Sequence, residues 1–204
     1  MDHTLREWVR LGEKCGLAQA ALDAQAKETR MDRTHIRQVM LAHWHDMQSA
    51  IRTGLEPGLR SVSGLSGGQA VKLLNRMQEG KSLCGTLLGK AEAYALATAE
   101  CNACMGKIVA APTAGACGIL PGLLQALAEE RNFQEDALVD ALFVAAAVGE
   151  SIASQASISG AEGGCQAECG SAAALAGAAV GCLGRGKPPQ GAGAAGFSNQ
   201  EPLG

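Results

Sequence analysis

The chain has 204 residues, of which 47% are hydrophobic and only 3% are aromatic. A formal charge of −3 leaves no basic field to attract nucleic acid or an anionic membrane, so neither partner is expected. Because Ala, Gly and Leu dominate while aromatic residues are rare, close-packed helices are favoured over a β-sandwich. We therefore expect a mainly α protein, built as a single helical domain.

The N-terminal residues MDHTLREWVRLGEK mix charged and apolar side chains and do not match a secretory signal. No apolar run reaches the roughly 18 to 20 residues that span a bilayer. We therefore expect a cytoplasmic protein without a membrane partner. In that compartment the eight cysteines are expected to be thiols, metal ligands or core residues rather than disulfides.

Apolar residues recur at steps of three and four from residue 5 to about residue 52, which predicts two amphipathic helices. The motif His43-Trp44-His45 lies in this region. Neighbours two apart on a helix face different sides, so surface or core histidines are favoured over metal ligands. A Gly, Pro and Ser stretch at 54–68 then breaks the pattern, and helices are predicted at 69–79 and 83–99.

A run dense in Gly, Ala, Pro and Thr at 101–118 predicts a loop, followed by helices at 119–130 and 136–153. A third small-residue loop, SISGAEGG at 157–164, opens residues 165–182, whose composition suits a helix buried on all sides. From residue 184 the periodicity is lost. We predict a helical domain at 1–182 and an irregular tail at 183–204, with glycine-rich loops at helix N-termini.

A Ser or Thr with glycines precedes a predicted helix three times, at 66–68, 112–115 and 157–160. Backbone N–H groups and the positive dipole end at a helix start bind carboxylates and phosphates, and glycine allows close approach. Each loop alone is more simply an ordinary N-cap and turn. Because nucleotide fingerprints are absent, the repetition indicates a small anionic substrate.

Cysteine spacing adds two further patterns. Cys165 and Cys169 are four residues apart and share a helix face, while Cys101 and Cys104 have the CxxC spacing of zinc or redox sites. A second CxxC or a matching His pair, which a zinc site would require, does not occur in the sequence. The spacing alone does not choose among these chemistries.

Three segments resemble the alpha subunit of the iron-sulfur-dependent L-serine dehydratases: SGLSGGQAVKLL, NACMGKIVAAPTAGACGILPG and ASISGAEGGCQAECGSA. The resemblance spans roughly residues 5 to 182. It implies a largely helical fold, a 4Fe-4S cluster, and conversion of L-serine to pyruvate and ammonia. A separate beta subunit is the expected partner, because no regulatory domain precedes SGLSGG.

The resemblance also implies roles for individual residues. Cys165, in the GCQAE motif, is the implied cluster ligand, whereas Cys101, Cys104, Cys117 and Cys169 are interpreted as packing residues. No residue is assigned as the base that removes the α-proton, although Lys72, Lys90 and Lys107 are considered. The implied substrate-binding residues lie in the three loops: Ser66, Gly67, Gly68, Thr113, Gly115, Ser157, Ser159 and Gly160.

Members of the family continue past this point with further cluster cysteines, so we expect the chain alone to be inactive. We hypothesise a reading-frame slip near residues 182–186. Codons for Asn199 to Gly204, read one base later, give Thr-Lys-Asn-Leu-Leu-Gly, which resembles the family's next segment. Resequencing the gene tests this. Two alternatives stay open: an inactive fragment that associates through small-residue helices, and a pyridoxal phosphate lyase, which requires a Schiff-base lysine beside a phosphate loop.

Overall fold

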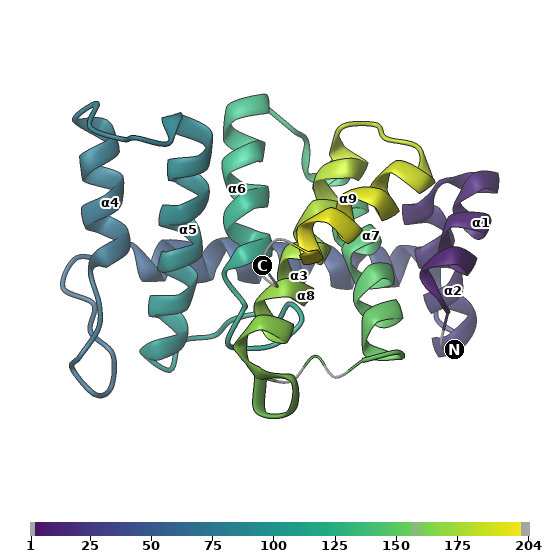
Figure 1. The fold of residues 1–204 in the computed structure, drawn as a ribbon, viewed down its shortest axis with the longest axis horizontal. Helices are drawn as coiled ribbons and strands as arrows, with labels where there is room; N and C mark the ends of the chain where they lie inside the picture. Colours follow the sequence, from purple (N-terminus) through teal and green to yellow (C-terminus); the bar gives the residue numbers. More distant parts are fainter. Residues whose placement is uncertain (1–2, 157, 159, 201–204) are drawn as a thin grey trace. The chain divides into compact units, whose positions relative to one another are not determined.

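The computed structural model describes residues 3–156, 158 and 160–200, and over these residues it contains nine helices and no strand (Figure 1). The expected mainly α class is therefore confirmed. The chain divides into two compact units, one of residues 1–42 with 134–204 and one of residues 43–133. Among the described residues, no helix has the length and apolarity that a bilayer crossing requires. The boundary predicted at residue 183 stays a prediction.

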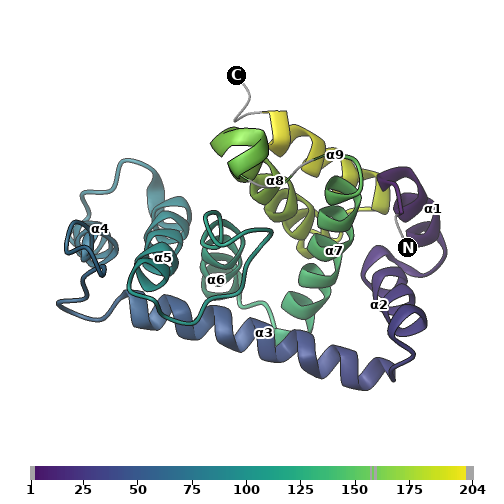
Figure 2. The same ribbon diagram turned by 90° about the horizontal axis from the view of Figure 1, so that it is seen from below.

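The first unit is built on two apolar helices that pack against each other, with shorter helices around them (Figure 2). Helix α7 buries residues on nearly every side, including Leu138, Val139 and Val148, and α8 buries a run of small residues from Gly170 to Ala179. The members of this unit are α1 (Leu5–Cys15), α2 (Leu17–Thr29), the start of α3 (Arg33–Gly54), α7 (Glu135–Ala153), α8 (Gly160–Leu183) and α9 (Pro188–Gln200).

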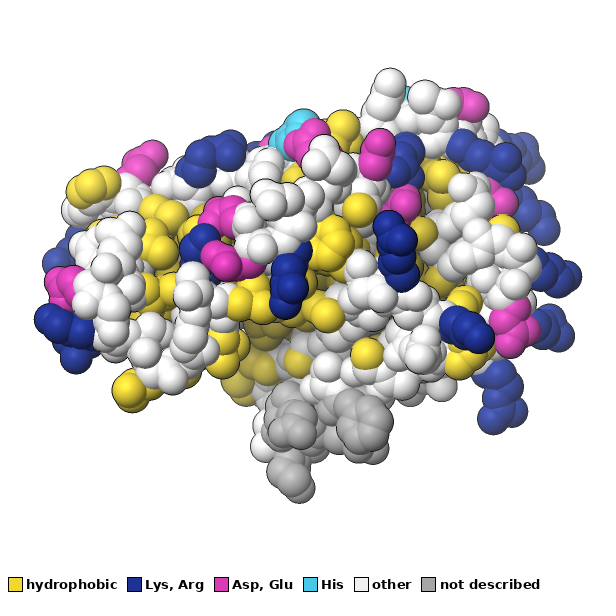
Figure 3. Space-filling view, turned by 90° about the horizontal axis from the view of Figure 1, so that it is seen from above, with side chains coloured by type: hydrophobic (Ala, Val, Ile, Leu, Met, Phe, Trp, Pro, Cys, Tyr) yellow, Lys and Arg dark blue, Asp and Glu magenta, His cyan; other side chains and the backbone are white. Residues whose placement is uncertain are grey.

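The prediction of two helices between residues 5 and 52 is wrong, because three form. Gly16 adopts φ 87° and ψ 148°, a conformation that interrupts the helix between α1 and α2. Arg30 then ends α2 in the left-handed region at φ 57°. On α1, Arg6, Arg10 and Lys14 recur at four-residue steps on the exposed face, and Figure 3 shows Lys and Arg side chains gathered over α1 and α2.

The irregular tail expected from residue 183 is also corrected, since α9 occupies residues 188–200. Two prolines are tolerated at the start of a helix, where the N–H groups have no partner within the helix. The small residues of α9 pack closely on α8: a Cβ added at Gly181 would lie 3.0 Å from Gly191 Cα. Ala195 is buried in this contact region. The packing of these small residues on α8 stabilises the helix. Small residues of this kind give no strong periodic pattern in the sequence.

The second unit sets three helices side by side with the remainder of α3 (Figures 1 and 2). They are α4 (Gln69–Gln78), α5 (Gly85–Ala103) and α6 (Ile119–Arg131). Their shared core contains Ile51 from α3 together with Ala70, Tyr94 and Ala126. Gly122 lets α6 approach α5 closely, since a Cβ there would lie 2.6 Å from Ala95 N. This packing places the C-terminal turn of α5 beside two of the predicted loops.

Candidate functional site

The loop before α4 is held in place by its own serines. Ser61 and Ser66 exchange hydrogen bonds, with Ser61 N donating to Ser66 O at 2.9 Å and Ser66 N donating to Ser61 Oγ at 3.1 Å. Gly67 adopts φ 138°, and an added Cβ would collide with the carbonyl oxygen of Leu59. The side chain of Ser66 is exposed. The loop is therefore a defined structure that presents the Ser66 hydroxyl to solvent.

The N-terminus of α4 already holds a carboxylate from the protein. Gly68 is the N-cap and contributes no side-chain cap. Instead, Glu100 of α5 accepts hydrogen bonds from Gly68 N at 2.9 Å and from Gln69 N at 2.6 Å, one on each carboxylate oxygen. Glu100 is buried, with 6% of its surface exposed. Sequence reasoning identified the anion-binding geometry here but missed Glu100, which occupies it.

The second predicted loop meets the same turn of α5. Asn102 donates from Nδ2 to the carbonyl oxygen of Ala114 at 3.0 Å, between Thr113 and Gly115. Gly115 is exposed, and Thr113 is half-buried. Because Glu100 and Asn102 lie in the last turn of α5, the structure brings the Ser66 loop and the Thr113 loop to one end of that helix.

The third predicted loop belongs to the other unit. Ser157 and Ser159 lie outside the described residues, and Gly160 is the first residue of α8. The prediction of a loop through residue 164 needs correction, because residues 160–163 are helical. Gly164 interrupts α8 with φ 77° and ψ 174°, so a second helical segment begins at Cys165. Glycine is needed there because a side chain is strained at that φ.

Cys165 and Cys169 occupy the first exposed turn after this interruption. Their Sγ atoms are 3.9 Å apart. Cys165 is exposed and Cys169 is half-buried. Burial raises the pKa of the Cys169 thiol, and the hydrogen bond with Cys165 raises it further. Residues 165–182 were predicted to be buried on all sides, which holds for about residues 170–179 but is wrong for this turn and for Val180, which is exposed.

Cys101, Cys104, Cys117 and the two histidines of the His43-Trp44-His45 motif occupy core and surface positions. Cys101 and Cys117 are buried, and burial raises the pKa of Cys101. Cys104 donates from Sγ to the carbonyl oxygen of Arg60 at 2.8 Å, which ties the Ser66 loop to α5. His43 and His45 are exposed on either side of the buried Trp44. Across the described residues, no three His, Cys, Asp or Glu side chains are grouped so as to hold a metal.

The candidate lysines differ in how well they would serve as bases. Lys90 Nζ forms ion pairs with Glu129 at 2.9 Å and Glu130 at 2.8 Å. The hydrogen bond to Glu130, followed by that to Glu129, raises the pKa of Lys90, which keeps the amine protonated and unsuited to accept a proton. Lys107 pairs with Asp46 at 2.7 Å, and Lys72 is exposed.

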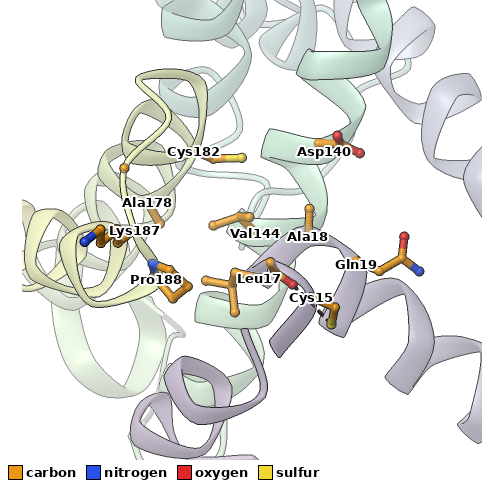
Figure 4. Close-up of a pocket in the computed structure, with 13 residues that line it drawn as sticks. Cys15, Leu17, Ala18, Gln19, Asp140, Val144, Ala178, Cys182, Lys187 and Pro188 are labelled. Atoms are coloured by element: carbon orange, nitrogen blue, oxygen red, sulfur yellow. Dashed lines mark hydrogen bonds between the residues drawn. The ribbon is translucent and has the colours of Figure 1, made fainter. Parts of the chain in front are cut away.

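A cavity of about 360 Å³ lies within the first unit, and none of the predicted site residues lines it (Figure 4). It is bounded by the start of α2, the middle of α7, the end of α8 and the start of α9. The thiol of Cys182 faces it, and burial raises the pKa of that thiol to about 11. The Asp140 carboxylate forms an ion pair with Arg37, whose Nη1 lies 2.6 Å from it. Sequence reasoning gave no signal for this cavity, because the prediction had no helix α9.

Comparison with known proteins matches residues 12–204 to the family model described as "Serine dehydratase alpha chain". A probable L-serine dehydratase alpha chain of Bacillus subtilis is 47% identical over 158 residues, which cover 78% of this chain and 52% of that protein. The L-serine dehydratase alpha chain of Peptoniphilus asaccharolyticus is 36% identical over 182 residues, covering 88% and 62%. An L-serine dehydratase of Streptomyces coelicolor is 35% identical over 193 residues, covering 90% and 41%. The chain thus spans about half the length of these relatives.

Proposed function

Because the chain belongs to the serine dehydratase alpha chain family, we propose that it is the serine-binding and cluster-anchoring part of an iron-sulfur L-serine dehydratase alpha subunit. The reaction would convert L-serine to pyruvate and ammonia in amino-acid catabolism. The observation that carries the proposal is the family match over residues 12–204, supported by relatives named L-serine dehydratase. The eight free thiols are consistent with the proposed cytoplasmic location.

The described residues do not by themselves fit a complete 4Fe-4S cluster. Such clusters are held by several Cys thiolates, usually four, and the described residues contain no group of three or more suitable ligands. Cys165 is nonetheless suited to be one anchor, since it is exposed at a helix start after Gly164. We therefore propose Cys165 as one ligand of a shared site. The expectation that the chain alone is inactive stays a prediction.

For substrate binding we propose Ser66, Gly67, Gly68, Thr113, Gly115 and Gly160, with Ser157 and Ser159, which lie outside the described residues. The role of the α4 N-terminus changes from the sequence interpretation. Since Glu100 already accepts from Gly68 N and Gln69 N, those amides support the loop rather than grip the substrate carboxylate. In the second unit, the exposed Ser66 hydroxyl and the Thr113 loop are then the parts left to contact the substrate, and Gly67 and Gly68 contribute by shaping the Ser66 loop.

A beta subunit is the proposed protein partner, on the strength of the words "alpha chain" in the names of the relatives. Large apolar side chains around the Ser66 loop support a contact there: Val62 is 78% exposed, Leu65 90% and Met105 83%. Val62 N also donates to Ala103 O at 3.2 Å, which fixes Val62 beside the end of α5. Exposed apolar side chains that lie close together often mark protein–protein interaction surfaces.

The test is anaerobic reconstitution with iron and sulfide, followed by a coupled assay for pyruvate formed from L-serine. The chain is assayed alone and together with the remainder of the Bacillus subtilis relative beyond the matched region, with its beta chain. We expect pyruvate only in the complemented mixture, and its loss in Cys165→Ser. Cys84→Ser, which changes an exposed thiol in the second unit, is the control and should retain turnover. Absence of bound iron and of pyruvate from every mixture contradicts the proposal.

A further inference from the structure

The first turn of the second segment of α8 holds two thiols close together. Cys165 and Cys169 project from the same helix face, one turn apart, and their Sγ atoms are 3.9 Å apart. Cys165 is exposed, so an ion has access from solvent, while Cys169 is half-buried. The family resemblance gives a role to Cys165 alone and leaves Cys169 as a packing residue.

The Sγ to Sγ distance distinguishes metal chelation from a disulfide. Two thiolates bound at about 2.3 Å to one tetrahedral ion are separated by about 3.8 Å, which follows from the tetrahedral angle. The observed 3.9 Å matches this value without movement of either side chain. A disulfide needs sulfurs about 2.05 Å apart and Cβ atoms about 4 Å apart, whereas Cβ atoms at this helical spacing are about 5 to 6 Å apart. Closing a disulfide would therefore distort the helix.

We infer that Cys165 and Cys169 form a two-thiolate chelate for a single soft divalent metal ion of the Zn²⁺ or Fe²⁺ class. The chelate fills two positions of a tetrahedral shell, and the described residues supply no grouped third ligand, so the other positions are open to water or an added ligand. One Cys165 thiolate cannot serve this ion and a 4Fe-4S cluster at once, so the inference concerns the chain before any cluster is assembled, and it makes Cys169 a ligand in its own right.

The test uses Co²⁺ as the probe, because tetrahedral thiolate coordination gives Co²⁺ a near-ultraviolet charge-transfer band and intense visible bands. The parent is the full chain with the other non-buried thiols removed by Cys15→Ser, Cys84→Ser, Cys104→Ser and Cys182→Ser. We expect one Co²⁺ per chain, displaced by Zn²⁺. Adding either Cys165→Ser or Cys169→Ser should weaken binding at least about tenfold, because the second thiolate then no longer binds intramolecularly.

A second measurement needs no substitution. In the unaltered chain, alkylation of each cysteine is followed by mass spectrometry of its peptide. Bound Zn²⁺ should slow alkylation of Cys165 and Cys169 together, without slowing alkylation of Cys84. The inference is overturned if Cys169→Ser binds Co²⁺ as tightly as the parent. It is also overturned if the pair closes to a disulfide with glutathione disulfide while Zn²⁺ protects neither thiol. Neither measurement uses serine turnover. A failure of the proposed function can therefore be distinguished from a failure of this inference.

Discussion

Glu100 caps a helix that lies more than thirty positions before it in the chain: its Oε1 accepts a hydrogen bond from Gln69 N at 2.6 Å. The second oxygen accepts from Gly68 N, so one buried side chain satisfies two amides of the α4 N-terminus. A carboxylate in this position also interacts favourably with the positive end of the helix dipole. The loop that carries Ser66 is therefore fixed from α5 rather than by a local cap.

The substitution Glu100→Gln tests this cap. The amide side chain keeps one acceptor oxygen but turns an NH₂ group toward the second backbone amide, so one hydrogen bond is lost and the other is no longer charge-assisted. We expect the free energy of unfolding of the α4 and α5 region to fall by about 2 kcal/mol, measured by urea denaturation and by amide exchange of the peptide spanning residues 61–75.

Glu92→Gln on the same helix is the matched control, since Glu92 is exposed. It should change stability by less than about 0.5 kcal/mol. Equal effects of the two substitutions, or unchanged exchange in residues 61–75 for Glu100→Gln, would show that Glu100 does not hold the loop.

Helices with a strong apolar pattern could be predicted from the sequence, whether they bury one face or, like α7, most of their surface. This applies to residues 69–79, 119–130 and 136–153, which the structure reproduces within a few residues as α4, α6 and α7. The missed helix α9 has no such pattern. Its contacts with α8 are made by small residues, Gly, Ala and Ser198, which form no apolar stripe along the segment, so only the tertiary contact reveals the helix.

The candidate site was predictable in part. Glycine-rich loops were expected before α4 and α6, and the close contact between Gly67 and Leu59 explains why glycine is needed in the first. The role of Glu100 could not be predicted, because it depends on a contact between residues far apart in the chain. The short distance from Cys165 to Cys169 follows from the four-residue spacing.

Gly67→Ala should disrupt the Ser66 loop. The added methyl group would collide with the backbone oxygen of Leu59, and φ 138° is strained for any residue with a Cβ. We expect a loss of about 3 kcal/mol in unfolding free energy. The comparison is Gly64→Ala in the same loop, where φ is 73° but no atom lies within 4 Å of the added methyl group. That change should cost only about 1 kcal/mol, from backbone strain. Similar losses would mean that the contact with Leu59 is unimportant.

Tyr94 is the one tyrosine in the sequence, so its ionisation can be followed by ultraviolet absorbance without overlap from another tyrosine. Burial, followed by the hydrogen bond to Glu129, raises the pKa of Tyr94 from 10.0 to about 12. The folded state keeps the proton that the unfolded chain loses near pH 10. The stability that this difference provides is complete below pH 10 and is lost as the pH rises toward 12. A native-state midpoint near 10, equal to that in urea, would contradict the buried environment.

The packing of α9 on α8 can be tested at one glycine of α8. A Cβ added at Gly177 would lie 2.9 Å from the backbone oxygen of Ala194, so Gly177→Ala must push the helices apart. We expect amide exchange in residues 188–200 to accelerate at least about tenfold, which corresponds to about 1.4 kcal/mol. Gly193→Ala on α9 is the control, because no atom lies within 4 Å of its added methyl group. Alanine favours helix over glycine by about 1 kcal/mol, so this control should slow exchange in the same residues. Opposite changes in the exchange rate from these two Gly→Ala substitutions would separate packing from helix propensity. Unprotected amides at residues 188–200 in the unaltered chain would rule out α9 altogether.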